Sequence, residues 1–91
     1  MSEDLPSDVV AVITQLSTAT LTALAEGDAD TARATVDTMA RVATNKLPAG
    51  DQRRTVRHAC DRIAALLTED PNFDAATAYV AALDRRFPTE S

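Results

Sequence analysis

The chain contains few of the residues that cross-link, bend or fill a protein. Its 91 residues include one cysteine, two glycines, four prolines, three aromatic residues and no tryptophan. A single cysteine cannot form a disulfide within the chain, so the sequence does not predict a disulfide-stabilised secreted domain. No charged, apolar and small-residue signal pattern opens the chain. We therefore expect a cytoplasmic protein.

The chain also lacks the residue groups that catalytic and metal sites require. One histidine, His58, and one cysteine, Cys60, cannot provide a zinc site within one chain. Two positions apart on a helix, they point to nearly opposite sides and cannot act as a catalytic pair. The sequence has no Gly-rich phosphate loop, no paired-carboxylate constellation and no C-x-x-C motif. We expect no catalysis, no metal and no cofactor.

One acidic segment imitates a calcium-binding loop without completing it. Asp70, Asn72 and Asp74 have the spacing of the first three ligands of such a loop. The sixth position, which should be Gly, is Ala75, and the twelfth, which should be Glu, is Ala81. The segment therefore predicts the start of a helix and not a calcium site.

A long uncharged run occupies residues 9–25, between Asp8 and Glu26. On a helix, its apolar residues cover about half of the circumference, which is wider than the ~100° stripe of a helix on the outside of a domain. The run is interrupted by threonines and is shorter than the ~20 mostly apolar residues of a membrane span. We therefore expect a helix that is packed against protein and no membrane insertion.

The side of this run that faces away from its apolar arc is also uncharged. Thr14, Thr18 and Thr22 recur every four residues, with Ala11 and Gln15 beside them. Such a side is either hidden within the bundle of its own chain or packed on a second chain. We predict that these five residues contact a protein partner or another copy of the chain in a homo-oligomer.

Helical periodicity runs through the whole chain. Apolar residues recur at three- and four-residue spacings, and no useful stretch alternates with period two. Glycines and prolines separate the patterns, which predict helices over 8–25, 29–46, 52–68 and 72–87. Because the connections are short, an all-α four-helix antiparallel (up-down) bundle is the favoured architecture, and an irregular orthogonal helical array is the alternative.

Polar residues at the breaks predict how the helices begin. Ser7, Asp51 and Asp70 are placed to cap the first, third and fourth helices. Pro71 then suits the first helical position. The acidic turn 28–30 suits the positive N-terminus of the second helix.

The net charge of −5 is unevenly distributed, because residues 31–68 carry seven basic against three acidic side chains. One outward arc of the third predicted helix holds four basic side chains, namely Arg54, Arg57, His58 and Arg62. Asp61 lies within this arc, where Arg57 is placed to pair with it. We interpret the arc as a patch for an anion or a partner protein, or as a solvated face matched to acids on neighbouring helices.

These features favour a non-catalytic protein-protein interaction or regulatory module that self-associates or docks through the first helix. The alternative is a small DNA-binding regulator that uses the arginine face, which net acidity and the lack of accompanying aromatics disfavour. A weaker alternative is an acidic inhibitor or antitoxin-like protein whose acidic ends mimic phosphate. The bias toward Ala, Thr, Asp and Arg suggests a high-GC bacterial genome.

Overall fold

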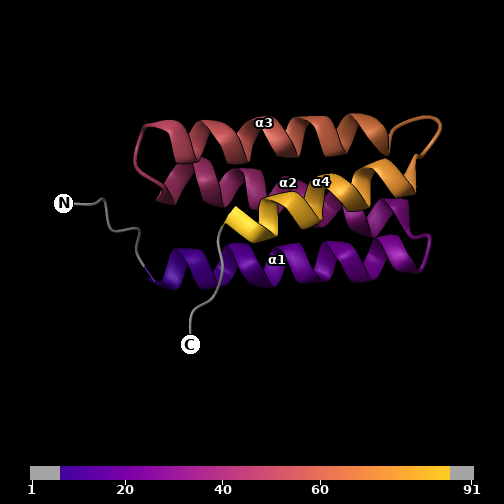
Figure 1. Cartoon of the computed structure of the whole chain (residues 1–91), viewed down its shortest axis with the longest axis horizontal. Coiled ribbons are helices and arrows are strands. Elements are labelled where there is room, and N and C mark those ends of the chain that lie inside the picture. Colours follow the sequence, from indigo (N-terminus) through magenta and orange to yellow (C-terminus); the bar gives the residue numbers. More distant parts are fainter. Residues whose placement is uncertain (1–6, 87–91) are drawn as a thin grey trace.

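Four helices make up most of the described chain. The computed structural model describes residues 7–86 and contains α1 (Ser7–Ala25), α2 (Ala29–Lys46), α3 (Asp51–Leu66) and α4 (Phe73–Arg86). No strand occurs within these residues. Figure 1 shows the helices lying along the long axis of the molecule, each running back along the one before it. The predicted all-α four-helix fold is confirmed.

The helices surround one shared core. α1 packs on α2 and α4, and α3 packs on the same two helices, while within residues 7–86 the backbones of the diagonal pairs lie farther apart. The largest fully buried apolar side chains come from all four helices and from the residue that follows α3, namely Ile13, Val36, Met39, Val56, Ile63, Val80 and Leu67. Phe73 is only partly buried against them. Phe87, which the sequence also predicts to face the core, lies outside the described residues.

Two threonine hydroxyl groups meet inside the core between α1 and α2. Thr20 is completely buried, and its Oγ1 lies 2.7 Å from Oγ1 of Thr35. Each hydroxyl also lies near a carbonyl of its own helix, at 2.7 Å from Leu16 for Thr20 and 2.9 Å from Ala32 for Thr35. When one hydroxyl donates to the other and the second donates to its own carbonyl, both groups are satisfied.

The start of α2 agrees with the prediction. Gly27 has a φ of 70°, which suits a glycine at the end of α1. Asp28 then caps α2, because its carboxylate accepts a hydrogen bond of 3.1 Å from the Thr31 N–H. Hydrogen bonds from the Thr31 side chain and then its backbone hold the pKa of Asp28 below its ordinary value, since they favour the charged form.

The starts of α1 and α3 differ from the prediction by one residue. Ser7 is already the first residue of α1, so it does not precede the helix as a cap. In the same way, Asp51 begins α3, and Gly50 takes the cap position without a side-chain hydrogen bond. Gly50 has a φ of 149°, which side chains rarely adopt, so the chain turns into the helix at this glycine.

The start of α4 also corrects the prediction. The helix begins at Phe73, and Asn72 precedes it with its side-chain Oδ1 accepting a hydrogen bond of 3.1 Å from the Ala75 N–H. Asn72 is therefore the cap in place of Asp70. Pro71 lies before the helix and not at its first position.

The reason for the later start lies in the end of α3. This helix ends at Leu66, two residues before the predicted end, and the Asn72 N–H donates to the Leu66 carbonyl at 2.8 Å. Glu69 takes a φ of 64° within the intervening turn. The turn therefore extends to Asn72 before the next helix begins.

Replacing Asn72 by alanine should lower the free energy of unfolding by about 0.5–2 kcal/mol, because the first turn of α4 loses its side-chain cap. Urea unfolding followed by circular dichroism measures the change. Asn45→Ala in α2 is the matched control, since Asn45 is exposed and caps no helix. Equal losses in the two variants would contradict a capping role for Asn72.

Candidate interaction surfaces

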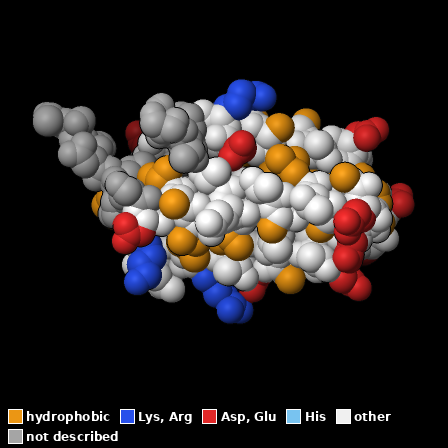
Figure 2. Space-filling model, turned by 90° about the horizontal axis from the view of Figure 1, so that it is seen from below, with side chains coloured by type: hydrophobic (Ala, Val, Ile, Leu, Met, Phe, Trp, Pro, Cys, Tyr) orange, Lys and Arg blue, Asp and Glu red, His pale blue; other side chains and the backbone are white. Residues whose placement is uncertain are grey.

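The side of α1 that faces away from the bundle is exposed and uncharged. Ala11, Gln15, Thr18 and Thr22 are exposed, and Thr14 is half-buried at the edge of this side. Figure 2 views the molecule from the side of α1 and shows hydrophobic and uncharged polar groups through the middle, with acidic groups gathered at one end. The structure thus places four of the five predicted contact residues on one accessible surface.

The exposed residues of α1 follow the spacing of a coiled coil. Steps of four and three residues alternate along Ala11, Gln15, Thr18, Thr22 and Ala25. This 3.5-residue repeat is the one with which a helix packs along another helix. Val12, which is 39% exposed, and Ala19 lie beside the repeat. We call these seven residues the α1 outer face.

The contact surface predicted from the sequence did not include Val12. The helical wheel alone could not exclude it from the core, because the two neighbours of α1 had not been located. The seven-residue step from Val12 to Ala19, which matches one heptad of the exposed repeat, was the feature of the sequence that could have indicated that Val12 belongs to the contact surface.

The composition of α1 also satisfies a simple criterion for a membrane span. Asp8–Ala25 has a mean hydropathy of 1.4 over 18 residues, and 33% of these residues are buried in the bundle. A core helix of a globular domain satisfies the same criterion, so length and composition alone are weak evidence for insertion.

The four basic residues predicted to form a patch are all exposed on α3, namely Arg54, Arg57, His58 and Arg62. Arg54 forms an ion pair of 2.8 Å with Asp51, and both side chains are largely exposed. The predicted pair between Arg57 and Asp61 does not form, and within residues 7–86 Arg57 has no ion-pair partner. The helix therefore presents free positive charge to solvent.

Two hollows adjoin this basic side of α3. The first has a volume of about 360 Å³, lies at the start of α3, and is lined by Ala49, Gly50, Arg53, Arg54, Arg57, His58 and Asp61. We call it the basic hollow. Arg53 is tied back to α2 because its guanidinium donates to the Thr44 carbonyl at 3.3 Å. Arg54 and Arg57 therefore remain as the cations available to a ligand, and the ring of His58 lies beside them as a hydrogen-bonding group.

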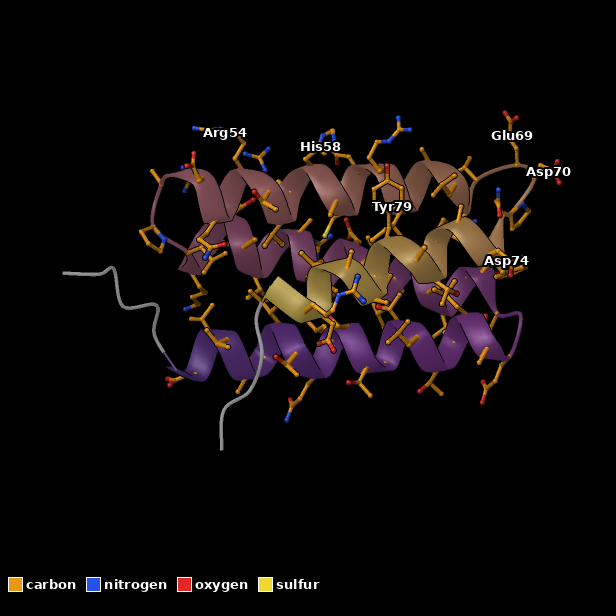
Figure 3. All side chains as sticks on the ribbon, in the orientation of Figure 1. Arg54, His58, Glu69, Asp70, Asp74 and Tyr79 are labelled. Atoms are coloured by element: carbon orange, nitrogen blue, oxygen red, sulfur yellow. The ribbon has the colours of Figure 1, made fainter. Side chains whose placement is uncertain are left out.

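The second hollow lies between α3 and α4 and has a volume of about 500 Å³. It is lined by Thr55, Ala59, Tyr79, Ala82 and Leu83, together with Arg54 and His58. We call it the α3/α4 groove. Figure 3 shows Arg54 and His58 projecting from α3, and Tyr79 rising from α4 toward α3. The sequence did not predict the groove, because the groove depends on Tyr79 of α4 lying beside α3, and helical periodicity does not place one helix beside another.

A comparison with protein families bears on the extent of this unit. One family model matches residues 1–89 of the chain. The chain belongs to the family described as Domain of unknown function (DUF8101). The matched region includes all four helices, so the α1 outer face and the α3/α4 groove both lie within this family domain. No curated protein and no solved structure matches the chain.

Cys60 lies on the opposite side of α3 from the basic patch. It is 2% exposed, whereas His58 is exposed to solvent. Burial raises the pKa of the Cys60 thiol to about 12, and the charges of Asp61 and Asp37 add to this effect. The thiol is therefore neutral at physiological pH, and the neutral form is not the nucleophile.

The acidic turn before α4 does not form a metal centre in the described part of the chain. Within residues 7–86, no group of three or more His, Cys, Asp or Glu side chains is arranged to hold a metal ion. The Asn72 side chain, which the calcium-loop pattern would require as a ligand, caps α4 instead.

Proposed function

We propose that this protein is a non-catalytic interaction module that associates through the α1 outer face, with a second copy of the chain as its partner. One observation supports this proposal above the others. The α1 outer face is solvent-exposed over the length of a helix and contains no charged residue, although charged residues make up 25% of the chain. An exposed helix face normally carries charged and polar residues, so an uncharged one favours a protein contact.

The residues of this face suit close packing between helices. Alanine loses no side-chain entropy when it is buried, and threonine loses little. The Thr22 hydroxyl already donates to the Thr18 carbonyl at 3.1 Å. Its burial at a contact therefore leaves no hydrogen-bond donor unsatisfied. The partly exposed Val12 adds an apolar side chain that such a contact would remove from water.

The charges at the ends of the face predict how salt affects association. Asp8 and Glu26 flank the α1 outer face, so either orientation of two paired helices brings acids toward acids. Salt screens this repulsion and leaves the apolar contact in place. Association through α1 should therefore strengthen as salt rises, whereas binding of an anion to the arginine face should weaken.

The arginine face of α3 supports DNA binding less well. Asp61 lies among the basic residues of this face. The net charge of −5 also repels a polyanion at long range. Because these acidic charges disfavour DNA binding by α3, we base the proposed function on the α1 outer face.

Replacing Thr18 by glutamate should raise the dissociation constant of the dimer by about tenfold or more, because a charge would be buried at the centre of the contact. Light scattering on a size-exclusion column, measured across protein and salt concentration, gives the mass. Thr77→Glu in α4 is the matched control, since it adds the same charge to an exposed helical threonine on another side.

Two results would count against the proposal. One is a wild-type chain that stays monomeric at every protein and salt concentration. The other is an equal loss of association in Thr18→Glu and Thr77→Glu, which would mean that added negative charge acts without regard to its position.

A further inference from the structure

The basic hollow and the α3/α4 groove are neighbours, because Arg54 and His58 line both of them. Beyond these two shared residues, the two parts differ in chemistry. The basic hollow adds Arg57, whereas the groove adds the apolar or small side chains of Ala59, Ala82 and Leu83. Positive charge therefore lies directly beside an apolar floor on one accessible surface.

We propose that these two hollows form one binding site for a small amphiphilic anion. Its apolar tail occupies the α3/α4 groove, and its phosphate or carboxylate head lies beside Arg54, Arg57 and His58. The groove removes apolar surface of the tail from water, and the guanidinium groups give charge-assisted hydrogen bonds to the head. The site is separate from the α1 outer face, because no residue of α1 lines either hollow.

The dimensions of the groove favour a small molecule over a partner helix. Thr55 and Ala59 are one helical turn apart on α3, and Tyr79 and Leu83 are one turn apart on α4. The floor is thus only ~6 Å long, since an α-helix rises 1.5 Å per residue, so it holds the part of an alkyl tail that lies next to the head. Its volume of about 500 Å³ lies within the usual range of small-molecule sites, roughly 300–1,000 Å³.

The state of the cations also favours an anionic ligand. Arg54 is 74% exposed and its ion-pair partner Asp51 is 92% exposed, so water screens the pair and a stronger ligand can replace it. Arg57 and His58 are exposed and have no ion-pair partner within residues 7–86. The head of the ligand therefore meets positive charge without breaking a buried interaction.

The chain contains one natural reporter for each half of this site. Tyr79 is its single tyrosine, there is no tryptophan, and His58 is its single histidine. Tyrosine emission therefore reports on the groove, and the histidine ring signals in a proton NMR spectrum report on the cations. Decyl phosphate below its micelle concentration is the probe. Decyltrimethylammonium and inorganic phosphate separate the contributions of the tail and the head.

We expect decyl phosphate to change the Tyr79 emission and the His58 signals together, in a saturable manner. The cationic amphiphile and inorganic phosphate should leave the Tyr79 emission unchanged at the same concentrations. An absence of any Tyr79 response to decyl phosphate would overturn the proposal. An equal response to decyltrimethylammonium would also overturn it, because the positive charge would then have no role.

Two pairs of variants locate the ligand on the structure. Arg54→Gln should weaken decyl phosphate binding by about tenfold, the loss expected for one charge-assisted hydrogen bond. Arg41→Gln should not change it, although Arg41 is also 74% exposed and paired with one aspartate. Ala82→Glu should block the tail, while Ala78→Glu, at an exposed alanine of α4 outside the groove, should not.

Circular dichroism checks that both variants of each pair are folded. A difference in decyl phosphate binding within a pair therefore reports on the site and not on stability. Equal binding by Ala82→Glu and Ala78→Glu would overturn the placement of the tail. Sedimentation of the protein with phosphatidylglycerol vesicles that is lost in Ala82→Glu, without a response to free decyl phosphate, would assign this surface to membranes and also overturn the proposal. Thr18→Glu should bind decyl phosphate normally, which separates this site from the dimer contact.

Discussion

Replacing Ile63 by alanine should lower the free energy of unfolding by about 2–5 kcal/mol, the usual cost of removing a large buried aliphatic side chain. Ile63 is completely buried in α3. The only described aromatic residue that packs against this core, Phe73, is itself partly buried, so few bulky side chains can move to fill the space. Small domains have a total stability of about 5–15 kcal/mol, so this loss is a large fraction of the whole. Urea unfolding measures it.

Val12→Ala provides the comparison for Ile63→Ala. Val12 is 39% exposed on the α1 outer face, so its truncation should cost less than about 1 kcal/mol in the monomer. The free energy of unfolding is measured at low protein concentration, so that association of the chains does not contribute to the difference between the variants. A similar loss in both variants would contradict the assignment of Ile63 to the core.

In the native protein, Cys60 should react with iodoacetamide at pH 8 about a thousand times more slowly than in the urea-unfolded chain. The pKa of the thiol rises from 9.0 to about 12 on folding, and each unit lowers the reactive thiolate population about tenfold. Burial of the sulfur slows the reaction further. Mass spectrometry of samples quenched over time gives both rates. Comparable rates would mean that the thiol is accessible in the folded chain.

The same shift predicts an effect of alkaline pH on stability. The folded state holds the thiol proton more tightly than the unfolded state, because the folded pKa is the higher one. This tighter binding of the proton stabilises the folded state. The stabilisation is complete below pH 9 and is lost as pH rises from 9 toward 12. Cys60→Ala should therefore lose less stability over that interval than the wild-type chain. A parallel decline in the two proteins would contradict the shifted pKa.

The sequence predicted the four helices well where one signal determined each boundary. α2 has the predicted ends, because Gly27 and Asp28 mark its start and Pro48 follows its last turn. The turn before α4 was harder, since Asp70 and Asn72 are both good caps and lie two residues apart. The choice depends on the hydrogen bond from the Asn72 N–H to Leu66, which periodicity does not contain.

The surfaces were predictable to the extent that each belongs to a single helix. The helical wheel gave the direction of Thr18 and Thr22 on α1, and of Arg54 and Arg57 on α3, and these side chains are exposed. The α3/α4 groove was not predictable in this way. It exists only because Tyr79 from α4 reaches the side of α3, and the lateral placement of two helices is a tertiary property.

The buried pair of Thr20 and Thr35 bears on the register of the bundle. Faces rich in alanine are smooth, so two such helices can slide along each other by one turn with little steric penalty. A slip of four residues along α2 that brings Met39 opposite Thr20 would replace this hydroxyl contact by a contact with a thioether, which is only a weak acceptor, and leave Thr20 with only its bond to the Leu16 carbonyl. The hydroxyl contact therefore favours the native alignment of α1 and α2 over this slip, as a polar residue in a coiled-coil core does.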